Sequence, residues 1–341
     1  MIDIGIIGTG WVSGIHIEAL RSCGDARVAA VAGRNLARAR ELAAMADERP
    51  GAEADARQGE PARAYASYGE MLDAQELDAV YICLPPHLHG EVELACARRV
   101  RAVLVEKPVG RDLRTVLQVR EAFDRAGTIV SVGYHNRYRK AARAVRDFYA
   151  KTERRPVLVA GSWVGDMPGP AWWRDKSESG GQFVEQCTHV VDLARWIAGD
   201  IVEASAMAAR GHAERAGATV EDAIVVNACF ASGAVGSFAT GCFVRADCPA
   251  RLGIGLSFSG PDSLCSFSGW DFDCVLKEGE REERIPPEPD IFALQARAFV
   301  QAVRSGDGAS IMSDYADGIE SLKVGLAANR SLERGGRPEA I

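Results

Sequence analysis

Short apolar runs alternate with amphipathic helical patterns along the first part of the chain. The apolar runs cover residues 2–7, 28–32, 79–84, 102–105 and 128–132. The helical patterns between them cover residues 15–23, 36–46, 91–98 and 113–126. Strand, helix and strand repeated in this order predict a parallel, doubly wound sheet. Residues 47–63 are rich in proline, glycine and charge, and we expect a surface loop there.

The pattern changes beyond residue 134. Longer runs rich in small and apolar residues cover residues 156–164, 223–231, 234–242 and 252–259, with turn signals such as Ser232-Gly233 and Gly260-Pro261 between them. Such runs predict hairpins of an antiparallel sheet. Two helical patterns follow, at 291–305 and 315–333. Because 341 residues exceed what one hydrophobic core usually supports, we expect two domains.

Composition and charge narrow the class of protein. The chain is 47% hydrophobic and 26% charged, as in ordinary globular proteins, and its net charge of −7 gives no electrostatic case for nucleic acid or an anionic membrane. Nine cysteines form no CxxC pair, which favours a reducing, cytoplasmic location and disfavours a zinc site, so we expect no metal. The first strand pattern begins at Ile2, which argues against a signal peptide.

A glycine motif follows the first predicted strand and precedes a helix. It reads Gly8-Thr9-Gly10-Trp11-Val12-Ser13. Gly8 permits a tight turn, Gly10 lets the backbone approach a pyrophosphate, and the helix N-terminus supplies free N–H groups. Ser13 stands at the third position of this fingerprint, where glycine is usual, and a purely structural turn is the alternative. The position in the pattern favours a dinucleotide site formed by residues 8–12.

Two further strand ends should border the same cofactor. The second strand ends in Gly33-Arg34-Asn35, with no carboxylate for a ribose 2′-hydroxyl, so Arg34 favours the 2′-phosphate of NADP over NAD. The alternative is that Arg34 is a solvated loop residue. After residue 83 the chain reads Leu84-Pro85-Pro86-His87-Leu88-His89, and we expect Leu84, Pro85 and His89 to line the cofactor site. Packing or capping is the alternative role of both histidines, since no metal-ligand cluster accompanies them.

Two segments supply candidate chemistry. Glu106-Lys107-Pro108 closes an apolar run, which places Lys107 where a strand meets the ligand-binding edge of the sheet. From Phe183 onward a helix is predicted, on which Glu185, His189 and Asp192 share one face through their spacings of four and three. Such a row offers an imidazole that a neighbour can orient. A solvent-facing polar stripe is the alternative interpretation.

Together these segments resemble the Gfo/Idh/MocA oxidoreductases along essentially the whole chain. The motifs, in order, are GIIGTGWVSGIH, VYICLPPHLHGE, VEKP, GYHNRY, WWRDK, GGQFVEQCTHVVDLARW and SDYADGIESLKVGLAANRS. The resemblance implies an α/β fold: a Rossmann domain with a doubly wound parallel sheet at residues 1–132, and an α+β domain at 133–341 with an open-faced, mostly antiparallel sheet. The second domain would bind substrate and form oligomers, and its last helices would pack back on the first.

The resemblance also implies roles for individual residues. Lys107 is similar to the family's lysine beside the nicotinamide and the reacting hydroxyl, and His189 to its acid/base histidine. Glu185 stands where many members carry an aspartate. The cofactor contacts implied from other segments are Glu106, Asn136 beside Arg137, and the pair Trp173 and Arg174, with Trp172 next to them. In this chemistry His189 takes the hydroxyl proton while Lys107 stabilises the alkoxide, and Glu185 orients the imidazole or holds a neighbouring hydroxyl.

We therefore expect an NAD(P)-dependent enzyme that transfers hydride between nicotinamide and a sugar, polyol or related cyclic alcohol. The alternatives are a dinucleotide-binding regulator without turnover and a redox-neutral, NAD-dependent glycoside hydrolase of the same family. Asp166, Arg245 and Asp271 are candidate substrate contacts, each equally compatible with a surface role. A homodimer or homotetramer is expected, because a broad sheet face rich in small and apolar residues needs either a partner subunit or a covering helix.

Overall fold

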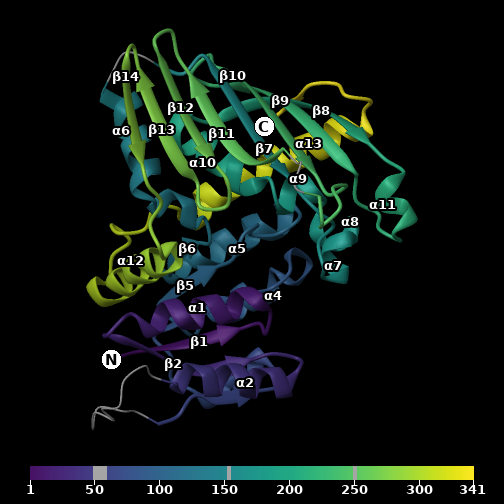
Figure 1. Ribbon diagram of the computed structural model, residues 1–341. Coiled ribbons are helices and arrows are strands. Elements are labelled where there is room, and N and C mark those ends of the chain that lie inside the picture. The colour runs from purple at the N-terminus through teal and green to yellow at the C-terminus, as the bar shows by residue number, and fades with distance from the viewer. Residues whose placement is uncertain (49–59, 152–154, 249–251) are drawn as a thin grey trace.

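The computed structural model describes residues 1–48, 60–151, 155–248 and 252–341 (Figure 1). Most of the surface loop expected at 47–63 lies outside the described residues. Within the described parts, no helix combines the length and apolar character that crossing a bilayer requires.

The first domain is built on a six-stranded sheet in which all strands run parallel, in the order β3-β2-β1-β4-β5-β6. Its elements are β1 (Ile2–Ile7), α1 (Trp11–Arg21), β2 (Ala26–Ala32), α2 (Leu36–Asp47), β3 (Arg63–Tyr65), α3 (Tyr68–Ala74), β4 (Ala79–Ile82), η1 (Pro86–Leu88), α4 (Glu91–Cys96), β5 (Ala102–Val105), α5 (Leu113–Ala126) and β6 (Ile129–Val132). The predicted doubly wound sheet is confirmed. The strand order reverses between β1 and β4, which opens a crevice at the carboxyl ends of these strands.

The second domain carries a nine-stranded sheet in the order β14-β13-β12-β11-β7-β10-β9-β8-β15. Its elements are η2 (His135–Tyr138), α6 (Lys140–Lys151), β7 (Leu158–Val164), α7 (Ala171–Arg174), α8 (Lys176–Ser179), α9 (Gln182–Glu185), α10 (Thr188–Ala198), β8 (Ile201–Ala209), α11 (His212–Arg215), β9 (Ala223–Phe230), β10 (Val235–Gly241), β11 (Gly253–Ser259), β12 (Ser263–Ser268), β13 (Asp273–Glu278), β14 (Arg281–Ile285), α12 (Ile291–Ser305), α13 (Tyr315–Glu333) and β15 (Glu339–Ala340). Among the described strands of this second sheet, only β7 and β10 pair in parallel, so the predicted mostly antiparallel sheet is also confirmed.

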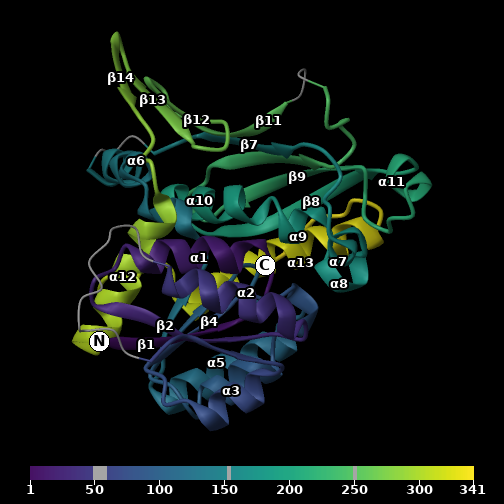
Figure 2. The ribbon, with the colours of Figure 1, turned by 60° about the horizontal axis from the view of Figure 1, so that its bottom comes forward.

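Helices separate the two sheets. Figure 2 shows α9, α10 and α13 between the nine-stranded sheet and the first domain, while no described helix covers the other face of that sheet. The apolar side chains of Met207 and Val225, which are neighbours on paired strands, are 77% and 45% exposed on the sheet surface. The expected open face is therefore present.

The last long helix belongs to both hydrophobic cores. Ile319 and Leu322 of α13 pack with the core around β5 and β6, whereas Ala327 and Ala328 pack with the core beneath the nine-stranded sheet. Two glycines allow this close approach. A Cβ atom on Gly318 would lie 2.9 Å from Val132, and one on Gly325 would lie 2.8 Å from Val184 of α9. Both separations are too short for real Cβ contacts, so larger residues here would push α13 away from its neighbours.

Candidate active site

A cavity of about 1520 Å³ lies in the crevice between the two domains. The loops after β1, β2, β4, β5 and β6 line one side of it, and β7, α7, the α9–α10 segment, β11 and the turn after β12 line the other. Small-molecule sites usually measure about 300–1,000 Å³. The cavity therefore has room for a large cofactor together with a second ligand.

The glycine motif forms one end of the cavity, and all five residues expected there, Gly8 to Val12, line it. Gly8 adopts a φ of 118°, and a Cβ atom on it would lie 2.1 Å from the carbonyl oxygen of Cys83. Glycine is therefore required for the turn to pass β4. Gly10 caps α1 without any side-chain hydrogen bond, and no atom lies within 4 Å of its ideal Cβ position. The free N–H groups and open space fit a pyrophosphate.

The end of β2 also opens into the cavity. Gly33, Arg34 and Asn35 line it together with Ser67 and Tyr68 at the start of α3, a helix that the sequence pattern did not predict. The Asn35 side chain caps α2 by accepting a hydrogen bond from the N–H of Arg38. Arg34 is exposed and forms no ion pair with any described residue. Its guanidinium is available to a ligand at this end.

The loop after β4 borders the same space, as expected for Leu84, Pro85 and His89. His89 is buried, with Nδ1 2.5 Å from Glu93 Oε1 and Nε2 3.1 Å from the Leu84 carbonyl oxygen. Burial lowers the pKa of His89, but Glu93 raises it more, and the net shift is upward. His89 thus links the loop after β4 to the helix α4 through hydrogen bonds. Among the described residues, no group of three or more His, Cys, Asp and Glu side chains could hold a metal ion.

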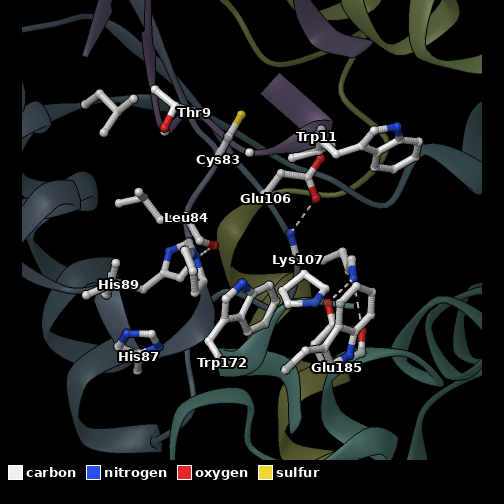
Figure 3. A pocket seen from close by; sticks show the side chains of 18 of the residues that line it. Thr9, Trp11, Cys83, Leu84, His87, His89, Glu106, Lys107, Trp172 and Glu185 are labelled. Carbon is white, nitrogen blue, oxygen red and sulfur yellow. Dashed lines mark hydrogen bonds and ion pairs between the residues drawn. The ribbon is translucent and has the colours of Figure 1, made fainter. Parts of the chain in front are cut away.

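Lys107 lies at the end of β5, between two carboxylates (Figure 3). Its Nζ donates to Glu185 Oε1 at 2.6 Å and to the Glu185 carbonyl oxygen at 3.0 Å. Glu106 Oε2 accepts a hydrogen bond from the backbone N–H of Lys107 at 3.0 Å, and Glu106 Oε1 lies 2.7 Å from Nε2 of the buried His16. Burial opposes ionisation of Glu106, yet the hydrogen bond and charge of His16 lower its pKa overall. An ionised Glu106 thereby fixes the backbone from which Lys107 projects.

The segment after Phe183 is not one helix, so the prediction of a shared face for Glu185, His189 and Asp192 is wrong. α9 ends at Glu185 and α10 begins at Thr188. In a continuous helix the Glu185 carbonyl would accept the N–H of residue 189, but here it accepts the Lys107 ammonium. The carboxylate of Asp192 instead binds Arg137, with oxygen–nitrogen distances of 2.6 and 2.8 Å.

His189 lies across the cavity from the glycine motif and is 7% exposed. Its ring stacks on Trp163, with centroids 5.4 Å apart and planes 23° apart, and the ring of His135 lies 5.0 Å away. Burial, followed by the charge of Lys107, holds the pKa of His189 well below its usual range. The imidazole is therefore neutral near pH 7 and can accept a proton.

Glu185 does not fill the first of its two expected roles, which was to orient the imidazole ring of His189. Its Oε1 is engaged by Lys107, and its Oε2 is buried without a hydrogen-bond partner among the described residues. Trp163 and His135 contact the imidazole instead, and sequence reasoning assigned neither of them a role. The second expected role, a grip on a neighbouring substrate hydroxyl, is compatible with the unpartnered oxygen.

Some of the remaining expected residues line the cavity and others do not. Trp172 and Trp173 stack at 5.4 Å and line the cavity, and Lys107 Nζ lies 5.9 Å from the Trp173 ring centre. Arg174 does not line the cavity, because its Nε donates to the Pro168 carbonyl oxygen at 2.6 Å.

Asn136 also lies outside the cavity, since its Oδ1 accepts from Arg139 at 2.9 Å, and the neighbouring residue that lines the space is His135. Of the candidate substrate contacts, Asp166 lines the cavity, whereas Asp271 does not. Arg245 is also absent from the lining and pairs with Asp247 on the surface.

A doubly wound sheet with an open helix N-terminus, facing a lysine and a neutral histidine across one cavity, defines a dinucleotide-dependent oxidoreductase. Comparisons with known proteins agree. Residues 2–134 match the family model described as "Oxidoreductase family, NAD-binding Rossmann fold", and residues 155–255 match the GFO/IDH/MocA C-terminal domain. The chain belongs to the Gfo/Idh/MocA family.

Several relatives are similar over most of their length. The chain is 26% identical to myo-inositol 2-dehydrogenase of Thermotoga maritima, covering 97% of this chain and 96% of the relative. It is also 26% identical to 1,5-anhydro-D-fructose reductase of Ensifer adhaerens, covering 79% and 81% of the two chains.

Solved structures share the fold. A levoglucosan dehydrogenase in complex with NADH superposes with a TM-score of 0.83 at 18% identity, covering 100% of this chain and 99% of the other. The WlbA dehydrogenase of Bordetella pertussis, in complex with NADH and UDP-GlcNAcA, gives a TM-score of 0.81 at 22% identity, covering 100% and 98%.

Proposed function

We propose that this protein is a dehydrogenase that transfers hydride between a nicotinamide cofactor and a secondary alcohol of a sugar, polyol or related cyclic alcohol. The observation that carries the proposal is the convergence of the Lys107 ammonium and the neutral His189 imidazole on the cavity that the glycine motif opens. The names of the relatives, which include an inositol dehydrogenase and an anhydrofructose reductase, support the same substrate class.

Each residue of the site has a separate role in oxidation of the alcohol. A bound nicotinamide supplies the carbon that accepts hydride. His189 accepts the hydroxyl proton, for which it must be neutral, and Trp163 holds its ring in place. Lys107 stabilises the developing alkoxide with its positive charge. Glu185 fixes the ammonium through Oε1 and offers Oε2 to an adjacent hydroxyl. In the reverse direction, protonated His189 returns the proton to the substrate oxygen.

Activity with a panel of substrates tests this proposal. Sugars and cyclitols should be screened with NAD and NADP in parallel, following the absorbance of the reduced nicotinamide. Turnover of at least one secondary alcohol is expected. Cofactor binding without turnover of any compound would favour a regulator. Substrate conversion by protein that retains its NAD, without net absorbance change, would favour a redox-neutral glycoside hydrolase.

We further propose a preference for NADP, based on the end of β2. Arg34 is the charged residue that the end of β2 contributes to the cavity lining. The carboxylates of the lining come from other segments, and they are Glu91, Glu106, Asp166 and Glu185. The Ser67 hydroxyl lies at the same end. A guanidinium without an ion-pair partner among the described residues suits a 2′-phosphate, whereas a ribose 2′-hydroxyl would be better bound by an acid.

The cofactor preference predicts a selective effect of Arg34→Ala. A charge-assisted hydrogen bond contributes about 1.5–3 kcal/mol, so NADPH should bind roughly tenfold or more weakly while NADH binding changes little. Nicotinamide fluorescence titration measures both dissociation constants. Arg38→Ala is a matched control, because Arg38 is exposed on the adjoining helix and pairs with Glu41. Equal weakening of both cofactors by Arg34→Ala would contradict the phosphate assignment.

We also propose that the open sheet face forms a homodimer or homotetramer. Val235 and Leu158 are paired neighbours on adjacent strands, exposed by 50% and 47%, and Met207 and Val225 form a second such pair. Rows of exposed apolar side chains on a broad sheet are typical of an interface between subunits.

A further inference from the structure

An exposed tryptophan lies at the outer end of the cavity. Trp270 is in the turn between β12 and β13, lines the cavity and is 59% exposed. Tryptophan combines a large apolar surface with one hydrogen-bond donor, so an exposed indole in a cavity offers a ligand both packing area and a hydrogen bond. Its position on the cavity rim points to a ligand that extends outward from the reacting centre.

The turn that carries Trp270 is rigidly anchored. Phe272, two residues later, is 2% exposed and adopts a φ of 54°, a conformation that a bulky residue rarely accepts without surrounding support. The Arg139 guanidinium lies 5.4 Å from the Phe272 ring and donates through Nη2 to the Trp270 carbonyl oxygen at 3.4 Å. Gly269 N–H donates to the Ile254 carbonyl oxygen at 2.9 Å. The backbone is thus fixed while the indole remains open to solvent, which is the arrangement of a preorganised contact.

Aromatic rings connect this turn to the acid/base residue. Trp163 stacks on His189 at 5.4 Å, and the ring of Trp270 lies 5.9 Å from Trp163 at an interplanar angle of 73°. The order outward from the chemistry is therefore His189, Trp163 and Trp270. A substrate ring placed for proton transfer to His189 borders Trp163, and a group attached to its far side reaches Trp270.

The walls between the two indoles indicate what this group is. Besides the two tryptophans, β7, β11 and the turns that follow β7 and β12 contribute Val164, Gly165, Asp166, Gly253, Ile254 and Gly269 to the lining, and none of these residues carries a positive charge. Ideal Cβ positions on Gly253 and Gly269 meet no atom of the described residues within 4 Å, so these residues leave open space beside them. A phosphate or carboxylate finds no cation among these residues, whereas a neutral ring with an apolar face can pack on an indole.

We propose that Trp163 and Trp270 form a subsite for a second ring, glycosyl or aryl, attached to the alcohol that is oxidised. The physiological substrate is then a glycoside or similar conjugate rather than a free monosaccharide or inositol. The subsite rests on the proposed oxidation at the same cavity, since it extends from His189. Neutral extended substrates should be preferred over their short counterparts through a lower KM.

Matched glycosides of one sugar test the subsite. The methyl, phenyl and glucosyl glycosides, as both anomers, are compared by kcat/KM with the cofactor at saturation. For the wild type, the phenyl or the glucosyl form should exceed the methyl form by about tenfold, or about 1.4 kcal/mol, and the two arms separate an aryl from a glycosyl group. Trp270→Ala should abolish this gain while changing the methyl glycoside much less, and Trp270→Phe should keep part of it. Leu117→Ala, which removes an exposed apolar side chain on α5, is the control and should change neither value.

Three results would overturn the subsite: equal kcat/KM for short and extended glycosides in the wild type, equal losses for both in Trp270→Ala, or a changed oligomeric state in that variant with discrimination intact. Should no glycoside turn over, binding of the phenyl glycosides to protein saturated with NADH is measured by calorimetry. Binding that depends on Trp270 then supports the subsite although the proposed oxidation has failed. Absence of binding rejects the subsite.

Discussion

Replacing Lys107 by methionine tests whether its charge acts in the chemical step. Methionine keeps an unbranched side chain but removes the ammonium that binds Glu185. Charge stabilisers positioned at a reacting oxygen typically contribute about 10²-fold or more to kcat. We therefore expect Lys107→Met to lower kcat by roughly this factor, although the same change also disturbs the structure.

The structural cost follows from the ion pair. At 2.6 Å the attraction between the two charges is about 6 kcal/mol for an effective dielectric constant of about 20, and desolvation offsets much of it. The side chains of Lys107 and Glu185 are 12% and 4% exposed. Removing one partner of such a pair usually destabilises a protein by about 3–5 kcal/mol, because the other charge stays buried. Burial already raises the pKa of Glu185, and loss of Lys107 would raise it further.

The double variant Lys107→Met/Glu185→Gln separates the two effects. Without the buried carboxylate, the free energy of unfolding should return to within about 1–2 kcal/mol of the wild type, as for other replaced ion pairs. Urea denaturation measures this recovery, and steady-state assays with saturating cofactor measure kcat. If Lys107 stabilises the alkoxide, kcat stays low in the double variant. Recovery of most of kcat together with stability would refute the catalytic role and leave Lys107 a structural residue.

Two other predictions concern His189 and the open sheet. Burial and the nearby charge of Lys107 lower the pKa of His189, so kcat/KM for oxidation should remain level as the pH falls through about 6.5 and decline only below it. A pH profile whose acid limb is centred at 6.5 or higher would disprove that assignment. Met207→Glu places a charge on the apolar sheet face and should shift the protein toward monomers in light-scattering chromatography, whereas an unchanged mass would exclude this face as the interface.

Much of the first domain could be predicted because its signals are local. Buried parallel strands are continuous apolar runs, and the turn that passes β4 requires glycine at position 8, so both appear directly in the sequence. Lys107 could be placed at the ligand-binding edge because it follows such a run. The strand β3 and helix α3 were missed, since β3 has three residues, none of them buried, and too little pattern to detect. The sequence pattern also did not predict β8 or the strands β12 to β14. These strands bury only one face, so exposed side chains interrupt the apolar runs by which a strand is detected.

The parts of the site that escaped prediction depend on contacts between distant residues. The break between α9 and α10 arises where Lys107, 78 positions earlier, binds the Glu185 carbonyl, and no local pattern announces it. His16 meets Glu106 across 90 positions, and its only sequence signal is a polar residue between Ile15 and Ile17 in an apolar stretch. His135 stands inside the GYHNRY motif, in which the family resemblance points to Asn136, because the sequence does not show which of the two side chains faces the cavity.

The helix α13 affects how members of this family could be recombined. A chimera that joined residues 1–132 of one protein to residues 133–341 of another would bring a foreign Ile319 and Leu322 into the core of the cofactor domain. Its Ala327 and Ala328 would still match the sheet beneath which they pack. Exchange of substrate domains therefore needs a composite last helix, with its first half taken from the cofactor-domain parent and its second half from the other. The practical boundary for such engineering lies within a helix rather than in a linker.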